Sequence, residues 1–181
     1  MAVLAVLSVL YPIAVYSGRG MLSPLVFVAL ALFLVGLRVV TLRSEHARLW
    51  RLPLLGAGAL LVVLAANDGW LAAKSYPVVL SLAAAFAFGK SLFFPPSLIE
   101  RIARIHEPSL PPEGQAYCRI VTVVWTVWLL ANALIAALLA VSGNEEVWVL
   151  WTGLIAYVVM GVLFGGEMLL RRWLRQRSAA A

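Results

Sequence analysis

Charged and amide side chains inside or beside long apolar runs are the residues of this chain most able to do chemistry. An ionisable group in such a run is costly to bury, so by default it indicates a relay, an ion pair or a ligand contact. Each of these residues also has a purely structural interpretation, and the two are weighed together below. The candidate functional residues are Asp68, Lys74, Glu100, Arg101, Arg104, Asn132 and Glu167.

Their spacing suggests what each could do. Glu167 lies four residues before Arg171, the favourable order for an i, i+4 ion pair, although it could instead line a cavity. Asn132, midway along an apolar run, is expected to hydrogen-bond between helices. Asp68 and Lys74 flank the start of another run. They form either a boundary carboxylate with a snorkelling lysine or an ion pair at the mouth of a cavity.

Catalytic and metal-binding signatures are sparse. His106 and Glu107 are adjacent, but no second ligand follows at the spacing of a metal motif. The single cysteine, Cys118, has no base beside it in the sequence. Glycine motifs for phosphates or dinucleotides and the nucleophile elbow of hydrolases are missing as well. We therefore assign no catalytic, cofactor-binding or metal-binding residue, expect no cofactor, and favour a non-catalytic protein over an enzyme.

The composition determines the class of protein in which these residues sit. Of the 181 residues, 64% are hydrophobic and 12% are charged, and the mean hydropathy is +0.98. Soluble domains have about 45–50% and about 25% respectively. Unbroken apolar runs favour an all-α polytopic membrane helix bundle over a β-barrel, whose strands alternate in polarity. The net charge of +6 does not indicate nucleic-acid binding, because the basic residues lie at the ends of the apolar runs.

Six apolar runs are candidate membrane spans. We expect five to six transmembrane helices in a single bundle over residues 1–177, followed by a tail at 178–181. A spanning helix needs about 20 residues, so the second, fourth, fifth and sixth runs qualify. The first and third are short and could be interfacial or re-entrant. The runs cover residues 1–16, 22–42, 52–66, 70–94, 117–141 and 147–170.

The segment after the fourth run predicts a short amphipathic helix over residues 97–107 on the cytoplasmic headgroups. A proline pair ends the fourth run, and Ser97 and Glu100 have the spacing of a capping box. Pro108 stops the helix, and a turn-rich segment to Gly114 leads into the fifth run. The helix is either a connector or a partner-docking surface. Its apolar face would carry Leu98, Ile102 and Ile105, and Glu100, Arg101 and Arg104 would face away from them.

Basic residues mark one side of the predicted membrane. All of the 14 lysines and arginines except Arg19 and Lys74 fall in residues 38–51, 90–119 and 171–177. The positive-inside rule places these regions and the C-terminus in the cytoplasm. Asp68 and the turn around Glu145 would then lie outside. The chain is therefore expected to be a multi-pass membrane protein with a cytoplasmic C-terminus.

Short motifs along the chain carry a family resemblance. They run from Asn67-Asp68 through Lys74 and Pro77 to the segment 96–101, the Leu110-Pro111-Pro112 loop, Trp125 and Asn132. In this order they resemble the bacterial intracellular septation protein A family over about residues 22–174. The segments 95–104 and 107–112 and the pair Gly166-Glu167 are more similar to a lesser-known relative of that family, found with aryl-polyene or fatty-acid-like biosynthetic genes. The resemblance implies five or so spans and work in the cell envelope, and it implies no catalytic residue.

Three functions are consistent with these features. The leading hypothesis is a non-catalytic inner-membrane protein that supports envelope biogenesis or septation by holding partners at the membrane. The alternative is a carrier or flippase for a lipid-linked or polyene product, with Lys74, Asn132 and Glu167 lining one cavity. A second alternative is a membrane enzyme on acyl or prenyl substrates that uses Glu100, His106 and Glu107. The expected partners are the lipid bilayer and envelope or lipid-synthesis membrane proteins, not nucleic acid, and oligomers are possible.

Overall fold

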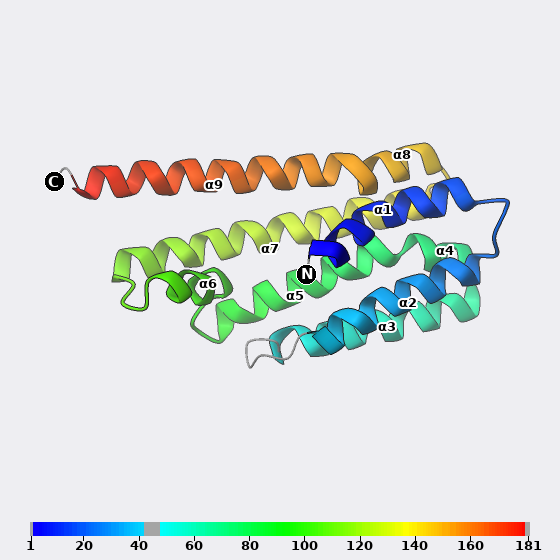
Figure 1. Cartoon of the computed structure of the whole chain (residues 1–181), viewed down its shortest axis with the longest axis horizontal. Coiled ribbons are helices and arrows are strands. Elements are labelled where there is room, and N and C mark those ends of the chain that lie inside the picture. Colours follow the sequence, from blue (N-terminus) through cyan, green and yellow to red (C-terminus); the bar gives the residue numbers. More distant parts are fainter. Residues whose placement is uncertain (1, 42–47, 180–181) are drawn as a thin grey trace.

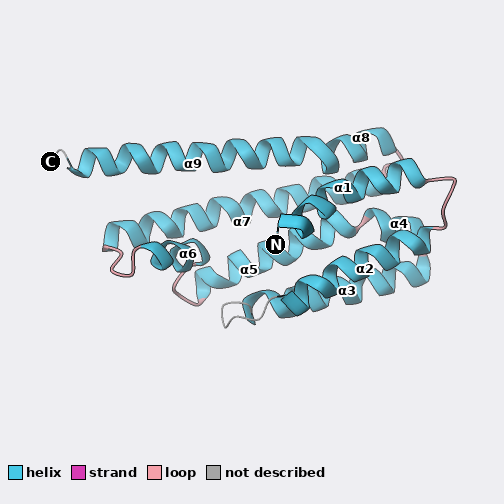
Figure 2. Cartoon of the chain, in the orientation of Figure 1, coloured by secondary structure: helices cyan, strands magenta, loops and turns pink. Residues whose placement is uncertain are grey.

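A computed structural model describes residues 2–41 and 48–179, and the regular structure of this part is helical (Figure 2). Lipid offers the backbone no hydrogen-bond partners, so a helix, which satisfies them internally, is what long apolar runs should form. The elements are α1 (Ala2–Gly18), α2 (Pro24–Thr41), α3 (Arg48–Asn67), α4 (Gly69–Lys74), α5 (Tyr76–Phe93), α6 (Leu98–His106), α7 (Pro112–Val141), α8 (Glu145–Leu150), the π-helical segment η2 (Trp151–Ile155) and α9 (Ala156–Ala179).

Five stretches of the described chain are long and apolar enough to cross a membrane: α2, α3, α5, α7 and the rod from α8 to α9. This confirms the all-α helix bundle and identifies a multi-pass membrane protein. The third run, expected to be short, qualifies because α3 begins four residues earlier and includes Pro53. The first run forms α1, an apolar helix of 17 residues that is shorter than the five spanning stretches.

In three places the helices differ from the predicted apolar runs. The fourth run is not one helix but breaks at Ser75 into α4 and α5, because Pro77 suits the first turn of a helix better than its interior. The fifth begins at Pro112, so part of the predicted turn segment is helical. The sixth continues to Ala179, so the expected tail at 178–181 is helical as far as the structure describes it.

The helices run side by side, and their connections lie at two opposite ends (Figure 1). One end carries α4 and the start of α8, and we call it the α4 end. The other, the α6 end, carries α6, the last part of α9, the end of α2 and the start of α3. Residues 42–47 between α2 and α3, including the basic Arg43, lie outside the described residues. Arg48 and Arg51, expected in a loop, belong to the first turn of α3.

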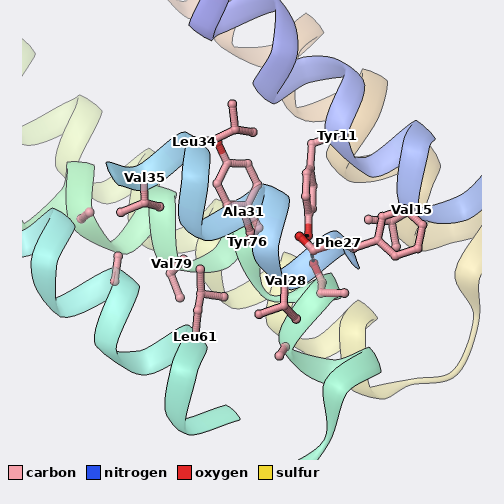
Figure 3. Packing of buried hydrophobic residues seen from close by; sticks show 14 of the residues in the cluster. Tyr11, Val15, Phe27, Val28, Ala31, Leu34, Val35, Leu61, Tyr76 and Val79 are labelled. Atoms are coloured by element: carbon pink, nitrogen blue, oxygen red, sulfur yellow. Dashed lines mark hydrogen bonds between the residues drawn. The ribbon is translucent and has the colours of Figure 1, made fainter. Parts of the chain in front are cut away.

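The main core lies among α1 to α5, near the α4 end. Ala31, Leu34 and Leu61 are fully buried there, together with Tyr76. Figure 3 shows Tyr11 reaching from α1 toward Phe27 of α2 within this core. Small and branched side chains let the helix backbones approach closely, which is how helices associate in lipid.

Tyr11 compensates for a missing backbone donor. Pro77 has no N–H, so the carbonyl four residues earlier, at Ala73, loses its helical hydrogen bond. The Tyr11 hydroxyl donates to that carbonyl at 2.9 Å and also contacts the carbonyl of Phe27 at 3.1 Å. Tyr11 and Ala73 are both buried. One phenol thus joins α1 to α2 and α4.

A second polar connection holds α1 in place. Arg38 of α2 donates from Nη2 to Ser8 Oγ at 2.6 Å, and Tyr76 Oη lies 2.9 Å from the same atom. The Tyr76 and Tyr11 rings pack with their centroids 4.4 Å apart. These contacts explain why α1 belongs to the bundle although it is shorter than the spanning helices.

We predict that Tyr11→Phe destabilises the bundle by about 1–2 kcal/mol, because the Ala73 carbonyl is left without a donor in an apolar site. Unfolding of the purified protein in increasing SDS, followed by circular dichroism, measures this. Tyr16→Phe on the exposed side of the same helix is the matched control and should change little. Equal stability of the two variants would contradict the role of Tyr11.

Candidate functional site

An open groove of about 730 Å³ lies toward the α6 end, between α5, α6, α7 and α9. It exists because α9 makes few contacts with other helices beyond η2, and its side chains from Gly161 to Arg171 are exposed or half-exposed. Its walls are mainly apolar, and two charged residues of α9 complete the lining. The residues around it are Phe88, Ile99, Ile102, Ala103, Val121, Trp125, Phe164, Glu167, Met168 and Arg171.

Glu167 does not form the ion pair that its spacing predicted. Glu167 and Arg171 are not joined by an ion pair within 4.0 Å in the described part of the chain. Instead, the Tyr117 hydroxyl of α7 donates to the Glu167 carboxylate and to its backbone carbonyl, each at 3.4 Å. Two opposite charges, one helical turn apart, therefore line the groove separately.

More charged groups gather near this mouth of the groove. Cys118, buried on α7, lies within electrostatic reach of Arg171 and Glu167 from α9 and of Glu100 and Arg104 from α6. Two helices, α6 and α9, thus bring acidic and basic side chains toward this part of α7. The sequence shows no base beside the single cysteine, and its acidic neighbours Glu100 and Glu167 come from α6 and α9, far from it in the chain.

The predicted helix after the proline pair is confirmed as α6, and Ser97 is its N-cap. Its first N–H groups are satisfied from other helices: Leu98 donates to Ser91 Oγ of α5 at 2.8 Å, and Ile99 to Thr122 Oγ1 of α7 at 3.4 Å. In the capping box, the Glu100 carboxylate accepts a hydrogen bond from the Ser97 backbone N–H at 3.3 Å. The Ser97 hydroxyl faces the helix N-terminus, but its contact falls outside hydrogen-bond geometry.

Packing decides which side of α6 turns toward the protein. Glu100 is only 8% exposed, whereas Ile102 and Ile105 of the predicted apolar face are 51% and 73% exposed and Leu98 of that face is buried. Glu100 forms an ion pair with Arg104 at 2.7 Å, and this pairing lets the carboxylate turn toward the protein. Arg101 donates to the carbonyls of Pro96 and Phe94, at 2.8 and 3.1 Å. The charged side chains of α6 therefore bind the preceding loop and each other, whereas Ile105 is exposed and Ile102 is half-exposed beside the groove.

At the α4 end, Asp68 and Lys74 do not pair with each other. Asp68 caps α4, because its Oδ1 accepts from the N–H groups of Trp70 and Leu71 at 2.9 and 3.0 Å. Lys74 lies 3.6 Å from the carboxylate of Glu145, which also pairs with Arg19. The sequence placed Glu145 only at the boundary. Its partners are Arg19, between α1 and α2, and Lys74, the last residue of α4, which both lie at the same end of the molecule. The signal in the sequence was that these oppositely charged residues were predicted on the same side of the membrane.

Asn132 confirms its predicted role between helices. Its Nδ2 donates to Ser81 Oγ of α5 at 2.9 Å, and its Oδ1 accepts from Trp151 Nε1 of η2 at 3.0 Å. Lys74 is at the α4 end, and Glu167 is in the groove toward the α6 end. The three residues expected to line one carrier cavity are thus dispersed over separate sites.

The residues of the enzyme hypothesis are placed as follows. Glu100 is buried in its ion pair, Glu107 follows α6 as its C-cap, and the His106 side chain lies outside the described residues. In the described part of the chain, no three His, Cys, Asp or Glu side chains are grouped so that they could hold a metal ion. We therefore take the groove and the docked α6 as the candidate functional site.

We predict that α6 is held by its neighbours more than by the cap hydroxyl. Ser91→Ala leaves the buried Leu98 N–H without an acceptor, at a cost of about 1–3 kcal/mol, so amide exchange over Ile99–Arg104 should accelerate at least about fivefold. Hydrogen exchange with mass spectrometry measures it. Ser97→Ala is the control and should have a smaller effect. A larger effect of Ser97→Ala would show that the cap holds the helix.

Comparisons of the chain with models of protein families, with curated proteins and with solved structures found no match. The resemblance to the septation protein A family therefore stays a hypothesis from short motifs. A function for this chain has to be argued from the geometry of α6 and of the groove beside it.

Proposed function

We propose that this chain is a non-catalytic multi-pass protein of the bacterial inner membrane that supports cell-envelope biogenesis or septation by holding a partner membrane protein. The observation that carries the proposal is α6, a helix fixed to the bundle that presents an apolar face outward. The motif resemblance gives the envelope setting, and the geometry of α6 suggests the contact surface.

The fixed position of α6 favours binding. Side chains from α5 and α7 accept hydrogen bonds from its first two N–H groups, and Arg101 and Arg104 are engaged by carbonyls and by Glu100. A helix already ordered before binding loses little further conformational freedom when a partner docks. Such a helix suits a permanent contact surface better than a flexible linker would.

The exposed face of α6 indicates the chemistry of the partner. Ile102 and Ile105 form its outward side, and Phe93 and Phe94 are also largely exposed at this end. Exposed apolar residues at a defined site favour contact with another apolar surface. The partner we propose is an integral membrane protein whose helix reaches the headgroup level at the α6 end.

A carrier for a lipid-linked or polyene product is the second candidate. The groove beside α9 favours it, since its apolar walls and charged mouth suit an amphiphile. The groove is confined to the region toward the α6 end, and the three polar residues expected along a transfer route are dispersed. Holding a partner is therefore the proposal that the geometry supports better.

The orientation required by this function places the α6 end in the cytoplasm, as the basic residues indicate. In a Cys118→Ser background, Glu146→Cys at the exposed start of α8 should react with a membrane-impermeant maleimide added from the periplasm. Ser109→Cys, exposed after α6, should react only once the inner membrane is disrupted. The reverse labelling pattern would contradict both the charge argument and the proposed site of binding.

Photo-crosslinking tests the contact surface directly. A photoreactive amino acid at Ile105 should form an adduct with an integral membrane protein of envelope or lipid synthesis, identified by mass spectrometry. The same amino acid at Met21, which is 85% exposed in the connection between α1 and α2, is the control and should not. Ile102→Asp should remove the Ile105 adduct without lowering membrane levels of the protein. Adducts with lipid alone, or the same protein adduct at both positions, would rule the proposal out.

A further inference from the structure

The groove beside α9 combines features of a ligand site with features of the membrane boundary. Its volume of about 730 Å³ falls in the usual range of small-molecule pockets, about 300–1,000 Å³. Phe88, Val121, Trp125 and Phe164 make its deeper part apolar. Arg171 is the last residue of the final apolar span, so the charged mouth of the groove lies at the level where the headgroups of the bilayer begin.

The two charges at this mouth remain available to a ligand. Arg171 lies beyond ion-pair distance of every carboxylate that the structure describes. Among the side chains that the structure describes, the Glu167 carboxylate has the long hydrogen bond from the Tyr117 hydroxyl, at 3.4 Å, and no ion pair within 4.0 Å. Both side chains line the groove, and one helical turn separates them. A ligand that carries a positive and a negative group a short distance apart would satisfy both.

We propose that this groove binds a phospholipid with a primary-amine headgroup, of the phosphatidylethanolamine class, independently of the partner proposed above. The phosphate pairs with Arg171, whose planar guanidinium can donate two parallel hydrogen bonds to it. The ammonium donates to the Glu167 carboxylate. One acyl chain lies along Val121, Trp125 and Phe164, between α7 and α9.

Charge complementarity distinguishes this lipid from others. Phosphatidylglycerol also offers a phosphate to Arg171, but it brings no cation to Glu167. Phosphatidylcholine carries a quaternary ammonium, which has no N–H to donate to that carboxylate. A second copy of α9 in the groove is the competing occupant, and it would exclude the lipid.

The test is native mass spectrometry of the full-length protein, purified in detergent and titrated with each of the three lipids. Wild type should bind phosphatidylethanolamine about tenfold more tightly than the other two, since a hydrogen bond to a charged group has about this effect. Arg171→Gln should weaken phosphatidylethanolamine and phosphatidylglycerol by about tenfold, and Arg171→Lys by less. Glu167→Gln should abolish the preference for phosphatidylethanolamine and make phosphatidylglycerol the more tightly bound lipid.

Arg119→Gln is the matched control. Arg119 follows Cys118 on α7, is exposed and does not line the groove, so the same charge is removed at the same level of the bundle. It should leave all three affinities unchanged. The proposal is overturned if wild type binds the three lipids equally, or if Arg119→Gln weakens binding as much as Arg171→Gln. It is also overturned if Phe164→Cys, in a Cys118→Ser background, forms disulfide dimers in native membranes, because a second copy of α9 would then occupy the groove.

Discussion

The carbonyl of Ala73 needs a hydrogen-bond donor that its own helix cannot supply, and the Tyr11 hydroxyl supplies it. Pro77 lacks the backbone N–H that would donate to this carbonyl, and a buried apolar site offers no water in its place. The bond from Tyr11, at 2.9 Å, permits the break at Ser75 that separates α4 from α5. It also fixes α1 against α2, and through that helix the core of the α4 end.

The same requirement shapes the other end of the molecule. The first N–H groups of α6 have no partners within the helix, and Ser91 and Thr122 accept from them across the bundle. Once its N-terminus is tied to α5 and α7, the helix can turn only one side toward the protein. Glu100 and Arg104 then pair, and Ile102 and Ile105 remain outside. The apolar surface that we propose for partner binding thus results from the hydrogen bonds that the first backbone N–H groups of α6 require.

The groove between α7 and α9 results from the separation of α9 from the rest of the bundle. A helix packed along its whole length would have closed the space between α7 and α9. Here the packing is concentrated near η2, and the groove remains open toward the α6 end. Glu167 and Arg171 line it without pairing to each other, so their charges face the space that a lipid headgroup could fill. The fixed α6 and the open groove place the two proposed contacts at the same end of the molecule.

The sequence by itself determined the class of protein, the helical architecture, the place and cap of α6 and the interhelical role of Asn132. Composition, the lengths of apolar runs and local capping patterns are enough for these, because each depends on neighbours in the chain. The tertiary structure decided which face of α6 turns inward, that Lys74 pairs with Glu145, and that Glu167 contacts Tyr117 instead of Arg171. In lipid both the buried and the exposed faces of a helix are apolar, so a hydrophobic pattern cannot say which face packs, and a charge takes whichever partner the packing of distant segments brings within reach.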